Sequence, residues 1–171
     1  MRILRHLLAI GLLPFVVAVV VPAYLTRASA GPGVGWNLAP SGPLPALVGS
    51  AFVGLGVLLV CQTVALFATV GKGTLAPWDP PQRFVVLGPY RYVRNPMISG
   101  VLSILLGEAI FFGSVPLLVW FSAFFAINAL VIPLVEEPQL ERRFGGDYVA
   151  YKREVPRWVP KRLALFRSYI H

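Results

Sequence analysis

One short stretch of the chain combines basic, aromatic and turn-forming residues at spacings that suit a ligand site. Arg91 and Arg94 lie three residues apart with tyrosines between and beside them, and Pro96 suits the first turn of a helix. Guanidinium groups bind carboxylates and phosphates with two parallel hydrogen bonds. An interfacial anchor, with arginines reaching the headgroups and tyrosines lying among them, explains the same pattern. The stretch reads Gly88-Pro89-Tyr90-Arg91-Tyr92-Val93-Arg94-Asn95-Pro96.

A pair of acidic residues, Glu136 and Glu137, follows the last apolar run of the chain and precedes Pro138. We expect a helix to end here, where each carboxylate opposes the helix dipole by about 0.3–1 kcal/mol at an exposed site. A positive partner removes this conflict, and the candidates are Arg91, Arg94 or a cationic ligand. The alternative is that both carboxylates are solvated and only mark the end of the helix.

The segment after the acidic pair has apolar and aromatic residues at helical spacing. The glycine pair Gly145-Gly146 predicts a helix stop, and Asp147 predicts the cap of a second short helix. A tail of this kind would lie as a lid over one end of a helical bundle. Its apolar side is predicted to contain Leu140, Phe144, Tyr148 and Tyr151.

Several chemistries are excluded by the residues that the chain lacks. Cys61 is the single cysteine, so no internal disulfide forms, and His6 and His171 lie at opposite ends of the chain. We therefore expect neither a metal site nor a Ser-His-Asp triad. The Gly54-Leu55-Gly56 sequence lies inside an apolar run and cannot form a dinucleotide-binding turn.

The composition predicts a membrane protein. Hydrophobic residues make up 57% of the 171 residues and charged residues 13%, about half the share that soluble domains carry. A helix needs roughly 20 apolar residues to cross a hydrocarbon core of about 30 Å. Four runs approach this length, the third being short and containing Glu108. They are residues 7–25, 44–70, 97–112 and 115–135.

These runs predict an all-α membrane protein with four transmembrane helices and a helical tail. Only Gly113 and Ser114 separate the last two runs, which predicts a tight hairpin. We expect one integral-membrane domain over residues 1–171, with the loop 77–96 and the tail 136–171 on the same side. Small residues recur every four positions in two runs and predict close helix packing. They are Ala46, Ser50 and Gly54, and Ser99, Ser103 and Gly107.

Lysines and arginines predict the orientation of the chain. Fourteen of the fifteen lie in the segments that this layout puts on one side, and only Arg27 lies on the other. The positive-inside rule therefore predicts a multi-pass protein, of the bacterial inner-membrane type, with both termini in the cytoplasm. Contact with anionic lipid headgroups accounts for the net charge of +8, so nucleic-acid binding is not needed to explain it.

In this order and separation, the motifs of the C-terminal half resemble the isoprenylcysteine carboxyl methyltransferase family. That family belongs with the integral-membrane phospholipid methyltransferases, and Asn95-Pro96-Met97 and Glu136-Glu137-Pro138 are closer to the pattern of the latter. The resemblance covers about residues 84–160. It rests on residues 88–96 with Gly100, on Glu136-Glu137, on Phe144-Gly145, on Tyr148 and Tyr151, and on Val155-Pro156.

The resemblance implies an S-adenosylmethionine-dependent methyltransferase without a Rossmann domain, with its cofactor at the cytoplasmic end of the last helices and under the tail. It implies catalytic roles for Arg91, Arg94 and Asn95, in which an arginine holds an anionic acceptor. No metal is implied. The cofactor-binding residues carried over are Tyr90, Arg94, Asn95, Pro96, Gly100, Glu136, Glu137, Tyr148 and Tyr151.

The resemblance implies a lipophilic methyl acceptor, which would enter from the bilayer. Three kinds stay open: a prenylcysteine-like carboxylate, a lipid headgroup amine or a small hydrophobic molecule. Asn95 stands where the carboxyl methyltransferases usually have histidine, and Ile98 where they have an aromatic residue. The phospholipid enzymes use asparagine at the first of these positions. The alternative function is a non-catalytic membrane scaffold or binding protein of the same fold, and the oligomeric state stays open.

Overall fold

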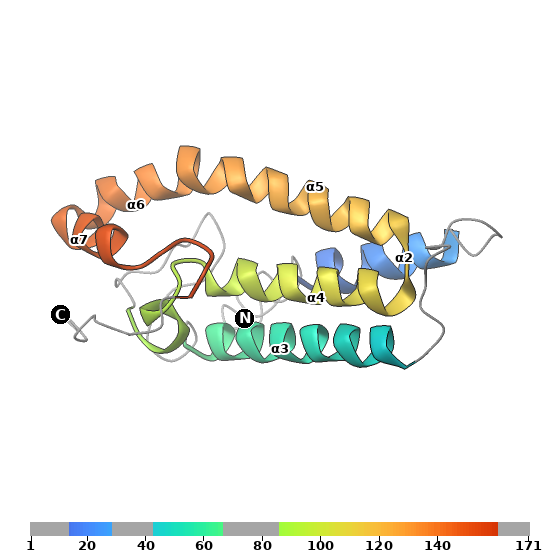
Figure 1. The fold of residues 1–171 in the computed structure, drawn as a ribbon. Coiled ribbons are helices and arrows are strands. Elements are labelled where there is room, and N and C mark those ends of the chain that lie inside the picture. Colours follow the sequence, from blue (N-terminus) through green and yellow to red (C-terminus); the bar gives the residue numbers. More distant parts are fainter. Residues whose placement is uncertain (1–13, 29–42, 67–85, 161–171) are drawn as a thin grey trace, which may run out of the picture.

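The computed structural model describes residues 14–28, 43–66 and 86–160, and the regular structure in these ranges is helical (Figure 1). The predicted all-α class is therefore confirmed for this part of the chain. In chain order the elements are the π-helical turn η1 (Val16–Val20), α2 (Val21–Ala28), α3 (Leu44–Leu66), the 3-10 turn η3 (Gly88–Arg91), α4 (Pro96–Phe112), α5 (Val115–Val131), the π-helical turn η4 (Ile132–Glu136), α6 (Glu137–Phe144) and α7 (Gly146–Glu154).

Two helices are long and apolar enough to cross a membrane. They are α3, with 23 residues, and the continuous helix Val115–Phe144, with 30 residues. The predicted run 44–70 is helical as far as Leu66, and residues 67–70 lie outside the described part. The apolar helices Val16–Ala28 and Pro96–Phe112 are shorter. At 1.5 Å per residue, the 17 residues of α4 span about 26 Å.

The helix that carries the acidic pair does not end there, so the predicted helix end at Glu136 is wrong. Helix α5 continues through η4 into α6 and ends at Phe144 (Figure 1). Pro133, which has no N–H to donate, lies inside the wider π turn η4, and Pro138 is the second residue of α6. The N–H of Glu137 donates to the carbonyl of Ile132, five residues earlier. This bond turns Glu137 to the buried side, where Ile132 also lies.

Helices α3 and α4 pack in antiparallel directions along a seam of glycines. A Cβ on Gly56 would lie 2.5 Å from the carbonyl oxygen of Gly100, and one on Gly49 would lie 2.7 Å from that of Gly107. These contacts are too short for any side chain, so the two backbones touch. The predicted stripe on α3 is wrong, because Ser50 is exposed and a Cβ on Gly54 would meet nothing within 4 Å.

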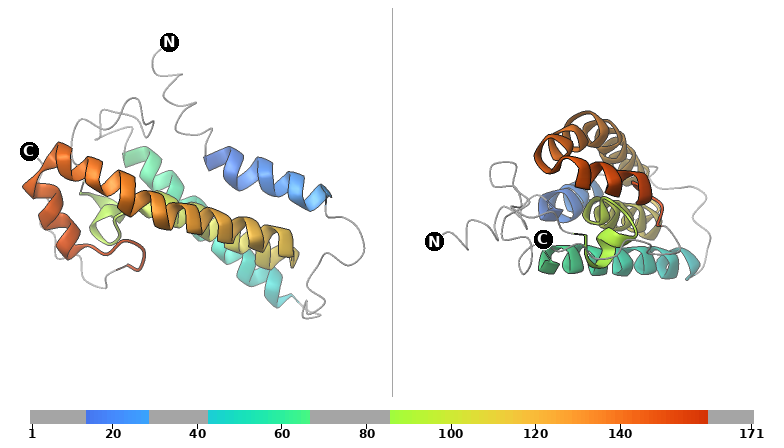
Figure 2. Two further views of the ribbon diagram at one scale, coloured as in Figure 1. Left: turned by 90° about the horizontal axis from the view of Figure 1, so that it is seen from above. Right: turned by 90° about the vertical axis from the view of Figure 1, so that its left-hand side faces the viewer.

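The long helix α5–α6 lies on the opposite side of α4 from α3, and α2 lies beside α4 (Figure 2). Seen from above, α2 lies beside the long helix α5–α6 (Figure 2). Buried residues of η1 and α4, among them Ala18 and Leu105, pack against Trp120 of α5. The indole N–H of Trp120 donates to the carbonyl of Val17 over 3.1 Å. The π-helical turn thus supplies an acceptor for a polar group that would be costly to leave unpaired in an apolar setting.

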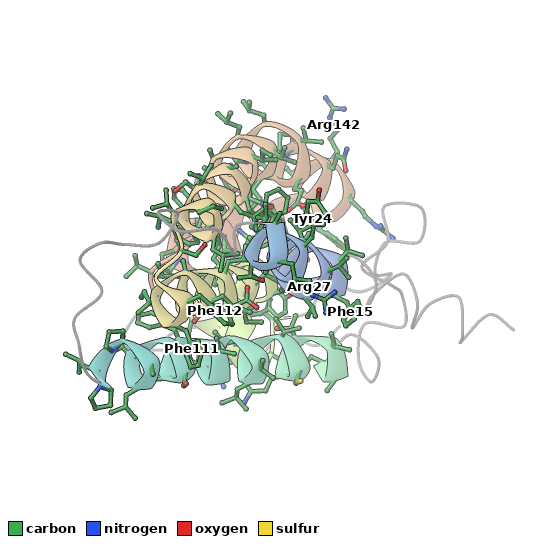
Figure 3. All side chains as sticks on the ribbon, turned by 90° about the vertical axis from the view of Figure 1, so that its right-hand side faces the viewer. Phe15, Tyr24, Arg27, Phe111, Phe112 and Arg142 are labelled. Atoms are coloured by element: carbon green, nitrogen blue, oxygen red, sulfur yellow. The ribbon has the colours of Figure 1, made fainter. Side chains whose placement is uncertain are left out.

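Large apolar side chains cover the outside of the bundle. Phe15, Tyr24 and Phe112 project away from their helices (Figure 3), with 55%, 70% and 57% of their surface exposed. An apolar exterior of this extent suits lipid contact, since in lipid only the backbone and polar groups need internal partners. Arg142 also projects outward, from α6, beyond the apolar part of the long helix (Figure 3).

Candidate functional site

The loop before α4 is a fixed turn that begins at a glycine. Gly88 has a φ of 54°, which favours glycine, and it starts the 3-10 turn η3, in which Pro89 is the second residue. The N–H of Tyr90 donates to the carbonyl of Leu87, and that of Tyr92 to the carbonyl of Pro89. Helix α4 then begins at Pro96, as the sequence predicts. The two loop arginines therefore project from an ordered backbone.

The tail folds back against this loop. Figure 1 shows α7 and the following segment returning from the end of α6 toward the start of α4. The backbone N–H of Arg94 donates to the carbonyl of Pro156 over 2.9 Å. The hydroxyl of Tyr151 donates to the carbonyl of Tyr90 over 2.7 Å. These two hydrogen bonds join parts of the chain that are about 60 residues apart.

An apolar cluster lies beneath these hydrogen bonds and confirms the predicted apolar side of the tail. Its buried members come from the segment before η3, from α7 and from the residue after α7, and two α6 residues pack on them. They are Val86, Tyr148, Tyr151 and Val155, with Leu140 and Phe144. Gly145, with a φ of 57°, ends α6 as predicted. It also caps α7, so Asp147 lies in the first turn of α7 and is not its cap.

Glu137 is the centre of a charged cluster between loop and tail. Its side chain is 2% exposed, and its Oε1 lies 2.9 Å from Nη1 of Arg94. Arg157 donates from Nε to Oε1 over 2.8 Å and from Nη2 to Oε2 over 3.1 Å. Nζ of Lys152 lies 3.2 Å from Oε2 and 2.7 Å from Oε1 of Glu141. We call Arg94, Glu137, Lys152 and Arg157 the Glu137 cluster.

The cluster keeps Glu137 ionised. Burial raises the pKa of this carboxyl, but the hydrogen bond from Arg157, the charge of Arg94 and the hydrogen bond from Lys152 outweigh burial and leave the pKa lowered. A buried charge of this kind is stable only while its partners stay in place. Arg94, one of the partners proposed from the sequence, pairs with Glu137.

Glu136 lies in a different environment from its neighbour. It is exposed, and it forms no ion pair with any residue that the structure describes. Although the residue is exposed, neighbouring atoms partly desolvate its carboxyl group, and this desolvation and the adjacent charge of Glu137 raise its pKa. The pair therefore divides into one carboxylate held by three basic side chains and one that is available to a cation.

The start of α4 contains buried polar atoms that lack partners. The Nε of Arg94 and the Oγ of Ser99 are buried and have no hydrogen-bond partner in the described part of the chain. Asn95 precedes the helix, but its side chain makes no capping hydrogen bond. Arg91 is half-buried beside them. Buried donors without acceptors are rare in folded proteins and indicate a place for a ligand or water.

Packing within the fold explains why two of the predicted site residues are a glycine and a proline. Gly100 faces α3, where a Cβ would lie 2.9 Å from both the carbonyl oxygen of Gly56 and a methyl group of Val60. Pro96 is fully buried at the first position of α4. Both residues fix the position of α4, which begins directly after Arg94 and Asn95.

Glu108 lies apart from this site. It is twelve residues beyond Pro96, which is about 18 Å along the helix. Its Oε2 is buried without a hydrogen-bond partner among the residues of the described ranges. Within those ranges no three residues of the types His, Cys, Asp and Glu gather as a metal site would require.

Sequence reasoning did not identify Arg157 and Lys152 as site residues. Arg157 follows α7 between Pro156 and Trp158, and the ring of Trp158 lies 5.8 Å from that of Phe125 on α5. One signal was available: a carboxylate on a helix face that turns inward needs basic partners, and the tail is rich in them. Choosing among the eight basic tail residues required the folded structure.

The fold is a helical bundle with two helices long and apolar enough to cross a membrane, and a charged cluster around Glu137 lies at one end of it. Residues 44–147, more than half of the chain, match the phospholipid methyltransferase family, and the chain belongs to this family. Its members are S-adenosylmethionine-dependent methyltransferases that act on lipid acceptors, so this protein is an integral-membrane enzyme of that class. A comparison with curated proteins finds no match.

The family match bears on some parts of the site and not on others. It includes α3, η3, α4 and the acidic pair, and it ends at Asp147. Tyr148, Tyr151, Lys152 and Arg157 follow the matched region. The tail contacts of the Glu137 cluster are therefore known from the structure of this chain alone.

Proposed function

We propose that the enzyme binds S-adenosylmethionine between the loop 88–96 and the tail, on the cytoplasmic face, and methylates the headgroup amine of a lipid. The single observation that carries this proposal is that the exposed Glu136, beside the buried Glu137 cluster, has no ion-pair partner among the residues that the structure describes. The two carboxylates are adjacent in sequence but only one has basic partners in the described structure. In this proposal a cationic ligand pairs with the carboxylate of Glu136.

The chemistry of the residues present fits this cofactor. S-adenosylmethionine offers a sulfonium and an ammonium, which suit the carboxylate of Glu136, and a carboxylate, which suits a guanidinium donor. The buried Nε of Arg94 and Oγ of Ser99 have no acceptor among the described residues. Acceptor and donor groups of both signs thus lie at the same end of the bundle, as the cofactor requires.

We assign the two glutamates different tasks. Glu136 binds the cofactor by charge, while Glu137 holds Arg94 in place from its buried position. Tyr90 and Tyr151 join loop and tail through one hydrogen bond, and Tyr148 packs with Tyr151 in the cluster beneath. In this proposal the two tail tyrosines shape the pocket without carrying out chemistry.

When bound, the cofactor supplies an electrophilic methyl group. The transfer is an in-line displacement, so the protein contributes mainly by holding the reactants close and aligned. Arg91 and Arg94 orient anionic groups of the reactants, and the amide of Asn95 is available for a hydrogen bond since it does not cap α4. Closure of the tail over the loop limits access of water to this end.

A headgroup amine is favoured among the three acceptor classes considered. Family membership implies a lipid acceptor, and Asn95 agrees with the phospholipid enzymes where the carboxyl methyltransferases have histidine. A lipid headgroup also lies at the depth of the bilayer where the proposed topology puts the loop. A prenylcysteine-like carboxylate and a small hydrophobic molecule are the alternatives.

The proposed topology has four membrane-spanning segments in one domain over residues 1–171, with both termini in the cytoplasm. It is supported by the two long apolar helices, by the shorter apolar helices Val16–Ala28 and Pro96–Phe112, and by the one-sided distribution of basic residues. The glycine seam supports it as well, because α4 packs along α3 as helices do in a bilayer.

The test is transfer of a labelled methyl group from S-adenosylmethionine to defined vesicles by the purified enzyme. We expect labelling of a lipid with an ethanolamine headgroup and none of a lipid with a glycerol headgroup. Labelling of a prenylcysteine analogue instead would show that the methyl acceptor is a carboxylate. Absence of labelling of every acceptor, with the protein folded, would contradict the proposal. The exposed variant Arg142→Gln serves as a control that retains activity.

A further inference from the structure

Arg157 holds the buried carboxylate of Glu137 with two parallel hydrogen bonds. Nε donates to Oε1 over 2.8 Å and Nη2 donates to Oε2 over 3.1 Å. This two-pronged geometry fixes both the position and the plane of a carboxylate, which a single point charge cannot do. Glu137 is 2% exposed and Arg157 is 28% exposed, so the carboxylate end of these bonds is shielded from solvent.

The backbone around Arg157 is itself held on both sides. The carbonyl of Pro156 accepts the backbone N–H of Arg94, and the ring of Trp158 lies 5.8 Å from that of Phe125 on α5. Three successive residues therefore contact the loop, the acidic residue and the long helix. A side chain on such a fixed backbone loses little freedom when it binds its partner.

Lys152 does not orient the carboxylate of Glu137 as Arg157 does. Its Nζ lies 3.2 Å from Glu137 but 2.7 Å from Glu141, and its side chain is 38% exposed. An ammonium shared between two carboxylates and open to water does not set the plane of either. Arg94 shares Oε1 of Glu137 with Arg157, so the orientation of this carboxylate determines where the guanidinium of Arg94 lies.

We propose that Arg157 is a positioning residue of the methyltransferase, acting through Glu137 to hold Arg94 at the cofactor site. This role rests on the proposed function in one respect, because it takes Arg94 to be a cofactor-binding residue. Arg157 itself touches neither reactant. Its loss releases Glu137 and Arg94 and leaves the rest of the bundle intact.

The experiment compares Arg157→Gln, Arg157→Lys and Arg153→Gln in the full-length protein. Arg153 is the matched control, because it is an exposed basic residue of the same tail. For Arg157→Gln we expect KM for S-adenosylmethionine to rise about tenfold, in the range of coupling between residues of one network, with kcat at saturation nearly unchanged. Arg157→Lys restores part of the loss, and Arg153→Gln matches the wild type.

A double-mutant cycle tests the route of the effect. In a Glu137→Gln background, Arg157→Gln should add little to the rise in KM, because the residue through which it acts is already altered. An equally large additional rise would show that Arg157 contacts the ligand directly and would overturn the positioning role. Unchanged KM in the single variant would overturn it as well.

Hydrogen exchange in the protein without ligand gives a readout that does not depend on catalysis. Arg157→Gln should speed exchange in peptides covering the loop 88–96, where the N–H of Arg94 is bonded to Pro156, and leave α3 and α4 protected. Equal loss of protection throughout the bundle would indicate a general structural role and contradict the inference. Should the wild type transfer no methyl group, this measurement still decides the positioning role, while the proposed function alone fails.

Discussion

The seam between α3 and α4 and the contacts around the start of α4 are held by opposite physical means. Along its length, α4 touches α3 through Gly100 and Gly107, where backbone meets backbone and any added atom overlaps. At its start, the loop and the tail meet through hydrogen bonds and ion pairs around one buried carboxylate, Glu137. The seam depends on the absence of side chains, and the Glu137 cluster depends on the charge of a few side chains.

This difference has a functional meaning. A seam of close backbone contacts fixes the relative positions of two helices and responds little to solution conditions. A cluster of charges responds to pH, to a bound ion and to the loss of one partner. The proposed ligand site belongs to the second region, where groups of both signs are available, and the first region gives it a rigid base.

The largest expected effect is from Glu137→Ala, which leaves the nine-tenths buried Arg94 without its carboxylate. Breaking a buried ion pair by removing one partner costs about 3–5 kcal/mol. Thermal or denaturant unfolding in detergent measures this loss. Glu141→Gln is the control: Glu141 is 37% exposed and pairs with an exposed lysine, so its removal should cost no more than about 1 kcal/mol. Equal losses in both would contradict the burial argument.

Low pH should also reduce the stability of the folded protein, as Glu137→Ala does. The folded-state pKa of Glu137 is lowered, so its contribution to stability is complete above its unfolded pKa of about 4.3. The contribution is lost as the pH falls below that value through the folded-state pKa. The raised pKa of Glu136 acts in the opposite direction. We expect the stability difference between wild type and Glu137→Gln to shrink below about pH 4.3 and to stay constant between about pH 6 and 8.

The seam is tested by comparing two glycines of α3. Gly56→Ala puts a Cβ 2.5 Å from the carbonyl of Gly100, and overpacking of this kind costs about 1–3 kcal/mol. Gly54→Ala meets nothing within 4 Å and should be neutral or stabilising, because alanine favours a helix more than glycine does. The melting temperatures of the two variants check this. If both lowered it equally, the seam would not pass through Gly56.

The smallest expected effect is from Tyr151→Phe, which removes one hydrogen bond between tail and loop. The hydroxyl donates to the carbonyl of Tyr90 over 2.7 Å, and a bond of this kind contributes about 0.5–1.5 kcal/mol. The aromatic packing is retained, so kcat should change little. Unfolding in detergent measures the change, and a loss of stability larger than that of Glu137→Ala would show that the hydroxyl, and not the buried carboxylate, holds the tail to the loop.

Local patterns predicted the parts of the fold that depend on neighbouring residues. The helical spacing of Leu140, Phe144 and Tyr148 identified the apolar side of the tail, and Gly145 ends α6 as expected. Motifs in the C-terminal half identified the family to which the chain belongs, and the loop and the acidic pair both lie within the matched residues 44–147.

Parts that depend on distant contacts were not predicted correctly. The helix was expected to end at Glu136, but a π turn with Pro133 in it continues the helix and turns Glu137 inward. The four-residue pattern that included Gly54 predicted the wrong face of α3 for packing against another helix. The seam uses glycines seven residues apart on both helices, a correspondence that appears only when the two helices are paired. Arg157 was missed because its partner is 20 residues away along the chain.

The central claim is that the end of the bundle containing Glu136 binds the cofactor. Calorimetric titration of the detergent-purified protein with S-adenosylmethionine, in the wild type and in Glu136→Gln, tests it most directly. We predict saturable binding at micromolar affinity in the wild type and at least about tenfold weaker binding in the variant, as expected for loss of a charge-assisted contact. Equal affinity in the two folded proteins would contradict the assignment of Glu136, and absence of binding in both would contradict the site itself.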